Sequence, residues 1–252
     1  LRPVKALALD VRSSGTRLFS AGVDGLVCVW DLDYQNMTAT PRLNSKFRPH
    51  RSWIWDMKYC SHLSTVLTCS SDCTIKAWNV DTAHSALELG THRDYVKALA
   101  PSNASDWVAS GSLDHHLCLW DLREGRKKPM WQLRTPSRIY SVASKLSGSV
   151  LATAGIDGVV PGWDPRMRDS AFELVGHEDL IRTMIMSSDG TRVISGSSDS
   201  TVRLWSTNER RCMHTYTHHN SSVWKLYSDD ENMSTFYSGD RDGFLCKVYL
   251  DP

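Results

Sequence analysis

The sequence repeats one pattern six times: a Ser or Thr, an Asp four residues later and, in five repeats, a Trp six residues after the Asp. The Asp residues are Asp24, Asp72, Asp114, Asp157, Asp199 and Asp242. The hydroxyl residues are Ser20, Thr68, Ser110, Thr153, Ser195 and Ser238. The Trp residues are Trp30, Trp78, Trp120, Trp163 and Trp205. A pattern that returns at so regular an interval indicates a repeat protein in which each copy forms the same small unit.

A period of about 40 to 45 residues with Trp-Asp endings is typical of the WD repeat, which forms one four-stranded blade of a β-propeller. The sequence therefore predicts an all-β WD-repeat β-propeller with six four-stranded blades in a single domain over residues 1–252. The predicted blades span residues 1–47, 48–89, 90–132, 133–174, 175–217 and 218–252. The last repeat ends just after its third strand, and an unclosed ring would expose sheet edges. We therefore expect these blades to belong to a longer ring of seven or eight.

Repeat five shows the expected blade most clearly. Residues 180–186, 192–196, 201–206 and 212–217 are predicted strands, separated by turns rich in Ser, Asp and Gly. Repeat four departs from this pattern because Pro161 falls in its third strand. Proline has no N–H for the strand ladder, so we expect a bulge there and the least regular blade of the six.

Charge and cysteine content narrow the function classes. The chain has 29 Lys and Arg against 28 Asp and Glu, a net charge of +1, so no general attraction to nucleic acid or to an anionic membrane is expected. Its seven cysteines are scattered through the repeats, which favours free thiols in the cytosol, the nucleus or both. No signal peptide, membrane-length segment or zinc-finger spacing is present. We expect no metal, cofactor or small-molecule substrate.

Three repeats also carry a His 22 residues before the Asp, and each His can link the Asp to the strand hydroxyl and the Trp indole. The residues assigned this structural role are His50, Asp72, Trp78, His92, Ser110, Asp114, Trp120, His177, Ser195, Asp199 and Trp205. Ser110, His92 and Asp114 resemble a hydrolase triad, but an enzyme has little use for three copies. Repeats one and four carry Arg2 and Thr135 instead of the His, and repeat six has a displaced His218–His219 pair and Val248 instead of Trp.

The candidate binding residues follow the Val or Ile that begins each first strand, and we call them the rim residues. They are Lys5, Trp55, Lys97, Tyr140, Arg182 and Trp224. Three are basic and three aromatic, and Trp, Tyr and Arg dominate the hot spots of protein interfaces. Arg241 precedes the last Asp and adds a second Arg beside Trp224. The pattern predicts a surface for an acidic or carbonyl-rich protein partner; the alternative is that Trp55 and Trp224 pack as core.

Several segments resemble the WD-repeat cofactors that activate ubiquitin-specific proteases. They are VKALALD (4–10), RLFSAG (17–22), THRDYVKALA (91–100), WDPR (163–166), SGSSDSTVRLWS (195–206) and YSGDRDG (237–243). The resemblance implies an eight-bladed propeller without catalytic activity that grips the fingers of the protease's catalytic domain. The family's contact residues are a basic residue after the GHxDxV segment, a Trp in the next repeat and an Arg before the last Asp. They match Arg182, where the family has Lys, Trp224 and Arg241.

Two other binding roles remain open. WDLR (120–123) and WDPR (163–166) resemble the short box through which substrate receptors join cullin-type ubiquitin ligases. The chain is also suited to be an architectural subunit of a large complex. A hydrolase acting through Ser110 is the least favoured function.

Overall fold

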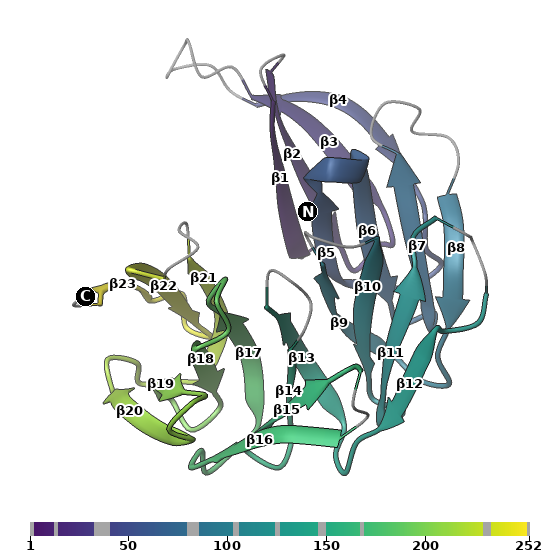
Figure 1. The fold of residues 1–252 in the computed structure, drawn as a ribbon. Helices are drawn as coiled ribbons and strands as arrows, with labels where there is room; N and C mark the ends of the chain where they lie inside the picture. The colour runs from purple at the N-terminus through teal and green to yellow at the C-terminus, as the bar shows by residue number, and fades with distance from the viewer. Residues whose placement is uncertain are drawn as a thin grey trace.

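The computed structural model describes residues 3–12, 15–32, 41–79, 86–102, 106–123, 127–145, 150–166, 169–228 and 233–250. Six separate antiparallel sheets follow one another along the chain and stand side by side in an arc, with the first and the sixth at its two ends (Figure 1). The predicted all-β propeller with six blades is confirmed. The number of blades in a closed ring stays a prediction.

The strands run from the inside of the arc outward in chain order. Blade one comprises β1 (Val4–Arg12), β2 (Gly15–Gly22), β3 (Val27–Leu32) and β4 (Arg42–Phe47). Blade two comprises β5 (Ile54–Cys60), β6 (Thr65–Ser70), β7 (Thr74–Asn79) and β8 (Ala86–Thr91), with a 3-10 turn over Ser61–Leu63. Blade three comprises β9 (Val96–Pro101), β10 (Trp107–Ser112), β11 (His116–Asp121) and β12 (Trp131–Arg134).

The second half of the chain repeats this order. Blade four comprises β13 (Ile139–Ser144), β14 (Leu151–Gly155), β15 (Val159–Asp164) and β16 (Asp169–Val175). Blade five comprises β17 (Ile181–Met186), β18 (Arg192–Ser197), β19 (Val202–Ser206) and β20 (Arg211–Tyr216). Blade six has three strands within the described residues, β21 (Val223–Ser228), β22 (Thr235–Asp240) and β23 (Leu245–Tyr249).

The strands of repeat five begin and end within one residue of their predicted limits. The outer strands β8, β12 and β16 extend one or two residues beyond the blade limits expected from the sequence, to Thr91, Arg134 and Val175. Alternating apolar residues and Asp-centred turns therefore locate strands closely, whereas the exposed outer strands, which carry a weaker pattern, are located less well.

Blade four is irregular, but only part of the irregularity comes from Pro161. The ladder between β14 and β15 holds two residue pairs, Leu151 with Trp163 and Ala152 with Gly162, against at least five between the second and third strands of every other blade. The missing N–H of Pro161 accounts for this loss. The register shift at Gly162 and Trp163 recurs beside the Trp of blades one and five, and blade two has a shift at Ile75 and Lys76. None of these three strands contains a Pro, so the expectation that Pro161 causes the bulge is wrong.

The hydrophobic core lies between neighbouring blades. Leu67 and Ile75 of blade two, for example, pack in one buried cluster with Leu99 and Trp120 of blade three. Gly90 at the outer edge of blade two faces the Trp120 ring so closely that a Cβ there would collide with it. Each blade therefore buries its faces only against its neighbours, and this stacking holds the inner strands at a common angle around one channel.

Candidate functional site

A β-bulge sets the direction of each rim residue. In all six blades the pairing of the inner strand with the second strand skips one residue, and the skipped residue is the rim residue. In blade five, for example, Ile181 pairs with Ser197 and Thr183 with Gly196, so Arg182 is unpaired. A bulge re-aims the side chain that it carries. The same bulge at the same offset turns six side chains toward the same end of the channel between the inner strands.

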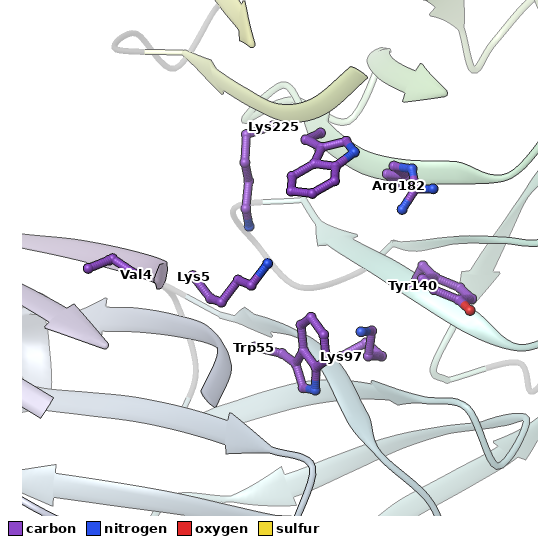
Figure 2. A pocket seen from close by; sticks show the side chains of 8 residues that line it. Val4, Lys5, Trp55, Lys97, Tyr140, Arg182 and Lys225 are labelled. Carbon is purple, nitrogen blue, oxygen red and sulfur yellow. The ribbon is translucent and has the colours of Figure 1, made fainter. Parts of the chain in front are cut away.

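The rim residues meet in one cavity of about 390 Å³, which is also lined by Val4 and Lys225. Lys5 and Lys225 extend into this space, and Trp55 and Tyr140 border it (Figure 2). Trp55 is half-buried and packs against the core cluster of blades two and three, so the alternative of a core role holds in part for this residue. Trp224 is 43 % exposed, which leaves its ring accessible to solvent.

Positive side chains and aromatic rings alternate around this cavity. Lys97 Nζ lies 2.9 Å from the Trp55 ring centroid and 5.5 Å from that of Tyr140. Lys5 Nζ lies 5.8 Å from the Trp55 centroid and 5.1 Å from that of Trp224, so it bridges the two indoles. The Arg182 guanidinium carbon lies 5.8 Å from the Trp224 centroid. These distances fall within the range of cation–π attraction, which holds the cations against the rings.

The cavity is electropositive. Among the described residues, no Asp or Glu lines it and no ion pair involves Lys5, Lys97, Arg182 or Lys225. Burial lowers the pKa of Lys97 to about 8, against the opposing influence of Cys69, and the positive charges of Lys5, Arg182 and Lys225 lower it further. Burial, the larger cause, disfavours a charge of either sign, whereas the neighbouring cations disfavour a further positive charge specifically.

In blades two and five the residue before the pattern Asp is a Ser that accepts a hydrogen bond from the rim residue. The Trp55 indole N–H donates to Ser71 Oγ over 2.6 Å, and Arg182 Nε donates to Ser198 Oγ over 2.7 Å. In blade six this position is Arg241, which cannot accept such a bond. No hydrogen bond to the Trp224 indole is formed within the described part of the chain.

Arg241 is the one predicted binding residue that does not line the cavity. It is exposed, and its backbone N–H donates to the carbonyl of Ser222 over 2.9 Å, two residues before Trp224. Arg241 therefore lies at the edge of the cavity, beside the start of β21. Lys225, which the residue pattern did not indicate, joins the cavity because it directly follows the bulged Trp224.

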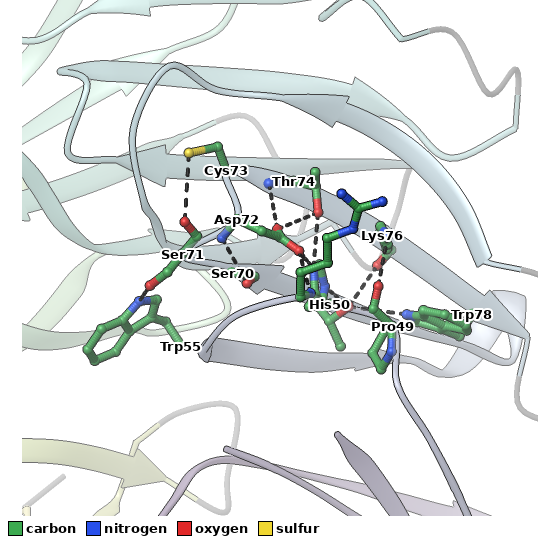
Figure 3. Close-up of polar contacts among 12 residues, drawn as sticks. Pro49, His50, Trp55, Ser70, Ser71, Asp72, Cys73, Thr74, Lys76 and Trp78 are labelled. Carbon is green, nitrogen blue, oxygen red and sulfur yellow. Dashed lines mark hydrogen bonds and ion pairs between the residues drawn. The ribbon is translucent and has the colours of Figure 1, made fainter. Parts of the chain in front are cut away.

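The structural network forms in all three repeats that carry the full residue set. In blade two His50 Nδ1 lies 3.0 Å from Asp72 Oδ2 and His50 Nε2 lies 2.8 Å from Thr68 Oγ1, which accepts from the Trp78 indole over 3.1 Å (Figure 3). The corresponding ring-to-hydroxyl distances are 2.7 Å for His92 and Ser110 and 2.7 Å for His177 and Ser195. Trp120 and Trp205 each donate to their own hydroxyl over 2.7 Å.

Blade six completes a network that the sequence pattern did not predict. His219 Nδ1 lies 3.0 Å from Asp240 Oδ2 and Nε2 lies 2.7 Å from Ser238 Oγ, so Asp240 rather than Asp242 accepts from the His. Among the described residues, blades one and four keep only the link from Trp to hydroxyl, Trp30 to Ser20 and Trp163 to Thr153. The Thr135 hydroxyl oxygen instead lies 3.1 Å from the carbonyl oxygen of His115 and 2.8 Å from that of Ser137, and either carbonyl can accept its proton. Arg2 lies outside the described residues.

The geometry of the triad-like residues suits stability rather than catalysis. Ser110 is fully buried, and its Oγ already accepts the Trp120 indole N–H and contacts the His92 ring. A nucleophile must reach its substrate, and Ser110 cannot. Over the described ranges, no group of three His, Cys, Asp or Glu side chains is placed to hold a metal ion. No helix among the described residues is long and apolar enough to cross a bilayer.

The arginines of the two ligase-like boxes lie away from the rim residues. Both follow the third strand of a blade, at the end opposite the start of the inner strand. The side chain of Arg123 pairs with Asp106, and exposed Arg166 bonds Asp164 through Nε and Nη2 over 3.1 and 2.9 Å. A partner bound through these arginines and one bound through the rim residues would therefore contact opposite faces.

Comparison with protein families agrees with this geometry. The family model of the WD40 repeat, described as WD domain, G-beta repeat, matches residues 2–31, 41–79, 84–121, 169–206 and 210–246. The second, third, fourth and fifth matches each begin near the outer strand of one blade and continue through three strands of the next. The longest stretch between matches, residues 122–168, contains β12 and the first three strands of blade four, where Pro161 shortens the ladder.

Proposed function

Because the chain belongs to the WD40 family of β-propellers, we propose that it docks the catalytic domain of a ubiquitin-specific protease and raises the activity of that enzyme. WD40 propellers are generally protein-interaction scaffolds without catalytic activity of their own, and their function lies in the residues that a rigid ring presents. The finer assignment rests on the resemblance of this chain to protease-activating cofactors and on the chemistry of the surface around Trp224.

The observation that carries the proposal is that the Trp224 indole is exposed and its N–H has no acceptor among the described residues. Its ring is 43 % exposed, a positive guanidinium lies 5.8 Å from its centroid, and Arg241 stands where blades two and five have a Ser acceptor. An exposed indole whose N–H has no acceptor among the described residues offers both a large apolar contact and a hydrogen-bond donor. Such residues anchor protein interfaces when a partner covers them.

The charge of the surface indicates the complementary chemistry. Arg182 and Arg241 flank Trp224, and neither forms an ion pair within the described ranges. An acidic or carbonyl-rich surface on the protease would accept hydrogen bonds from these guanidinium groups. A basic surface on another protein would be repelled by them. The seven free thiols suit a reducing compartment, so we place this role in the cytosol, the nucleus or both.

The test measures binding of the chain to a panel of recombinant ubiquitin-specific protease catalytic domains, together with hydrolysis of a fluorogenic ubiquitin substrate. Trp224→Ala should weaken binding at least about tenfold and abolish activation, because loss of a central aromatic residue typically costs ~2 kcal/mol or more. Tyr227→Ala is the matched control, since Tyr227 is 60 % exposed at the opposite end of the same strand, β21.

Two results would overturn the assignment. If no catalytic domain binds the parent chain, the protease is the wrong class of partner. If Trp224→Ala binds as tightly as the parent, or Tyr227→Ala loses as much affinity, the interface lies elsewhere on the propeller.

A further inference from the structure

The cavity at the rim collects more positive charge than a protein surface normally leaves uncompensated. Lys5, Lys97, Arg182 and Lys225 come from four different blades and line one space of about 390 Å³. None of them has an ion-pair partner within the described part of the chain. The whole chain has a net charge of only +1, so this concentration is local rather than a reflection of a basic protein.

At the opposite end of the same inner strands, a Lys has a carboxylate close by. Lys58 of β5 lies 3.8 Å from Asp56, the residue that follows Trp55. The second cavity, at that end, is lined mostly by apolar and neutral side chains such as Met184, Met186 and Tyr227. A carboxylate therefore accompanies the Lys at one end of the channel, while four cations gather at the other.

Aromatic rings take the place of carboxylates at the rim. Lys97 and Lys5 contact the Trp55 ring, and Lys5 and Arg182 contact that of Trp224. A ring face attracts a cation but accepts few hydrogen bonds, whereas a Lys ammonium has three donors and a guanidinium has five. The rings are thus occupied by cations of the chain itself, and most N–H donors of these cations remain available to an incoming acceptor.

Lys97 lies at the centre of this arrangement. The groups that act on its ammonium are the Trp55 and Tyr140 rings, the Cys69 thiol and the cations Lys5, Arg182 and Lys225. Burial raises the pKa of Cys69 well above its usual value, which favours the neutral thiol and limits the negative charge that it can offer to Lys97. A bound anion would relieve the repulsion among the four cations and would favour the protonated form of Lys97.

We propose that the rim cavity binds a compact, multiply charged phosphate anion, either an inorganic polyphosphate or the polyphosphate group of a small organic molecule. Cations that approach from β1, β9, β17 and β21 require a ligand with several charges and with oxygens that point in several directions. Phosphate oxygens suit the planar guanidinium of Arg182 and the point charges of the lysines. A cavity of about 390 Å³ falls within the size range of small-molecule sites.

This inference goes beyond the docking of a protease and is tested without one. Titration calorimetry with inorganic tripolyphosphate at pH 7 and physiological ionic strength should give saturable binding of one anion per chain. Orthophosphate should bind at least about tenfold more weakly, because it carries fewer charges. A parallel titration with ATP distinguishes the source: tighter binding of ATP favours an organic ligand, and tighter binding of tripolyphosphate favours an inorganic one.

Three variants make the test specific. Lys225→Gln removes an exposed cation of the cavity and should weaken tripolyphosphate binding about fivefold or more, and Lys97→Met should weaken it at least about tenfold. Lys46→Gln removes an exposed cation of the outer strand β4 and should change affinity by less than about twofold. No saturable binding by the parent chain, or an equal loss for Lys46→Gln and Lys225→Gln, would refute the site. Lys225 is exposed, so its variant keeps the test valid if Lys97→Met does not fold.

Proton uptake provides an independent readout. Near pH 8 about half of the free chains carry a neutral Lys97, and an anion should draw a proton onto it. The binding heats at pH 8 should therefore differ between Tris and HEPES, which have different heats of ionisation. For the parent chain the difference should correspond to the uptake of up to about half a proton. The Lys97→Met variant should take up far less of a proton when it binds the anion. The same uptake by both proteins would contradict the proposed contact between the anion and Lys97.

Discussion

His219 Nδ1 lies 3.0 Å from Asp240 Oδ2, although the repeated sequence pattern assigns the sixth Asp to position 242. Asp240 lies two residues after the strand hydroxyl, Ser238. In blades two, three and five the same position holds a Ser, whose hydroxyl accepts the backbone N–H of the pattern Asp. The other carboxylate oxygen of Asp240 accepts the backbone N–H groups of Asp242 and Phe244. One carboxylate thus orders both the His and the turn.

Asp240→Asn should therefore lower the urea midpoint of unfolding, and Asp242→Asn should leave it nearly unchanged. Burial alone would raise the pKa of Asp240, but bonds from His219 and from two backbone N–H groups outweigh it and lower the pKa. The Asp242 side chain is exposed, so its replacement removes little. The comparison is made by chemical denaturation of the two variants at pH 7; a larger loss for Asp242→Asn would restore the assignment based on the sequence pattern.

The network also predicts that equivalent hydroxyls differ in importance. Ser195 is fully buried between the His177 ring and the Trp205 indole, so Ser195→Ala leaves His177 Nε2 and the indole N–H without this partner and should cost about 1–3 kcal/mol. Ser20 is half-buried and, within the described ranges, binds only the Trp30 indole, so Ser20→Ala should cost about 1 kcal/mol or less. Urea denaturation measures both. Equal costs would show that the His contributes nothing to the role of the hydroxyl.

The sequence was sufficient to predict the six blades and to single out the residues that form the hydrogen-bonded sets of blades two, three and five, because both depend on a pattern that recurs at a fixed interval. His177, Ser195, Asp199 and Trp205 must meet if the strands pair as the pattern requires. The strand limits of blade five followed from the same alternation of apolar and polar residues. Features that repeat are therefore visible in one sequence even without relatives.

What the sequence did not reveal depends on backbone irregularity. The bulge that turns Arg182 and Trp224 into the channel leaves no residue signature, since the skipped positions hold Lys, Trp, Tyr or Arg. Lys225 joined the cavity through such a bulge. The use of Asp240 escaped the pattern because two carboxylates lie two residues apart, and only the geometry of the turn selects between them.

Acid should destabilise the propeller through its buried carboxylates. Burial would raise the pKa of Asp199, but the bonds from His177 and Thr201 dominate, and its pKa lies well below the usual value of 3.8. Asp72 and Asp114 are shifted in the same direction for the same reason. A lowered folded-state pKa stabilises the protein fully above about pH 4, and the contribution is lost as pH falls from there toward the folded-state value.

The measurement is the urea midpoint at several pH values between 7 and 3. For the parent chain it should be level down to about pH 5 and then fall. In Asp199→Asn the decline should be shallower and should begin from a lower midpoint. A parallel decline in both proteins would show that other groups govern acid unfolding.

We expect the charged Lys97 to lower the free energy of unfolding. Its pKa is about 8 in the folded protein against 10.5 ordinarily, because of burial and of the neighbouring cations Lys5, Arg182 and Lys225. The folded state therefore binds fewer protons than the unfolded state between about pH 8 and 10.5. The free energy of unfolding rises with pH across that range because of this group. Below about pH 8 Lys97 is protonated in both states, and the full cost of burying its charge lowers the stability. Lys97→Met removes the charge and keeps an apolar chain against the Trp55 ring.

At pH 7 Lys97→Met should be more stable than the parent by on the order of 1 kcal/mol, because partial solvent access and the attraction to the Trp55 ring offset much of the penalty. The advantage should shrink toward pH 10, where the parent Lys97 is neutral in the folded state. Urea denaturation at pH 7 and pH 10 measures both differences. A less stable variant at pH 7 would mean that the cation–ring contact outweighs the charge repulsion, and the cavity would then hold its cations without strain.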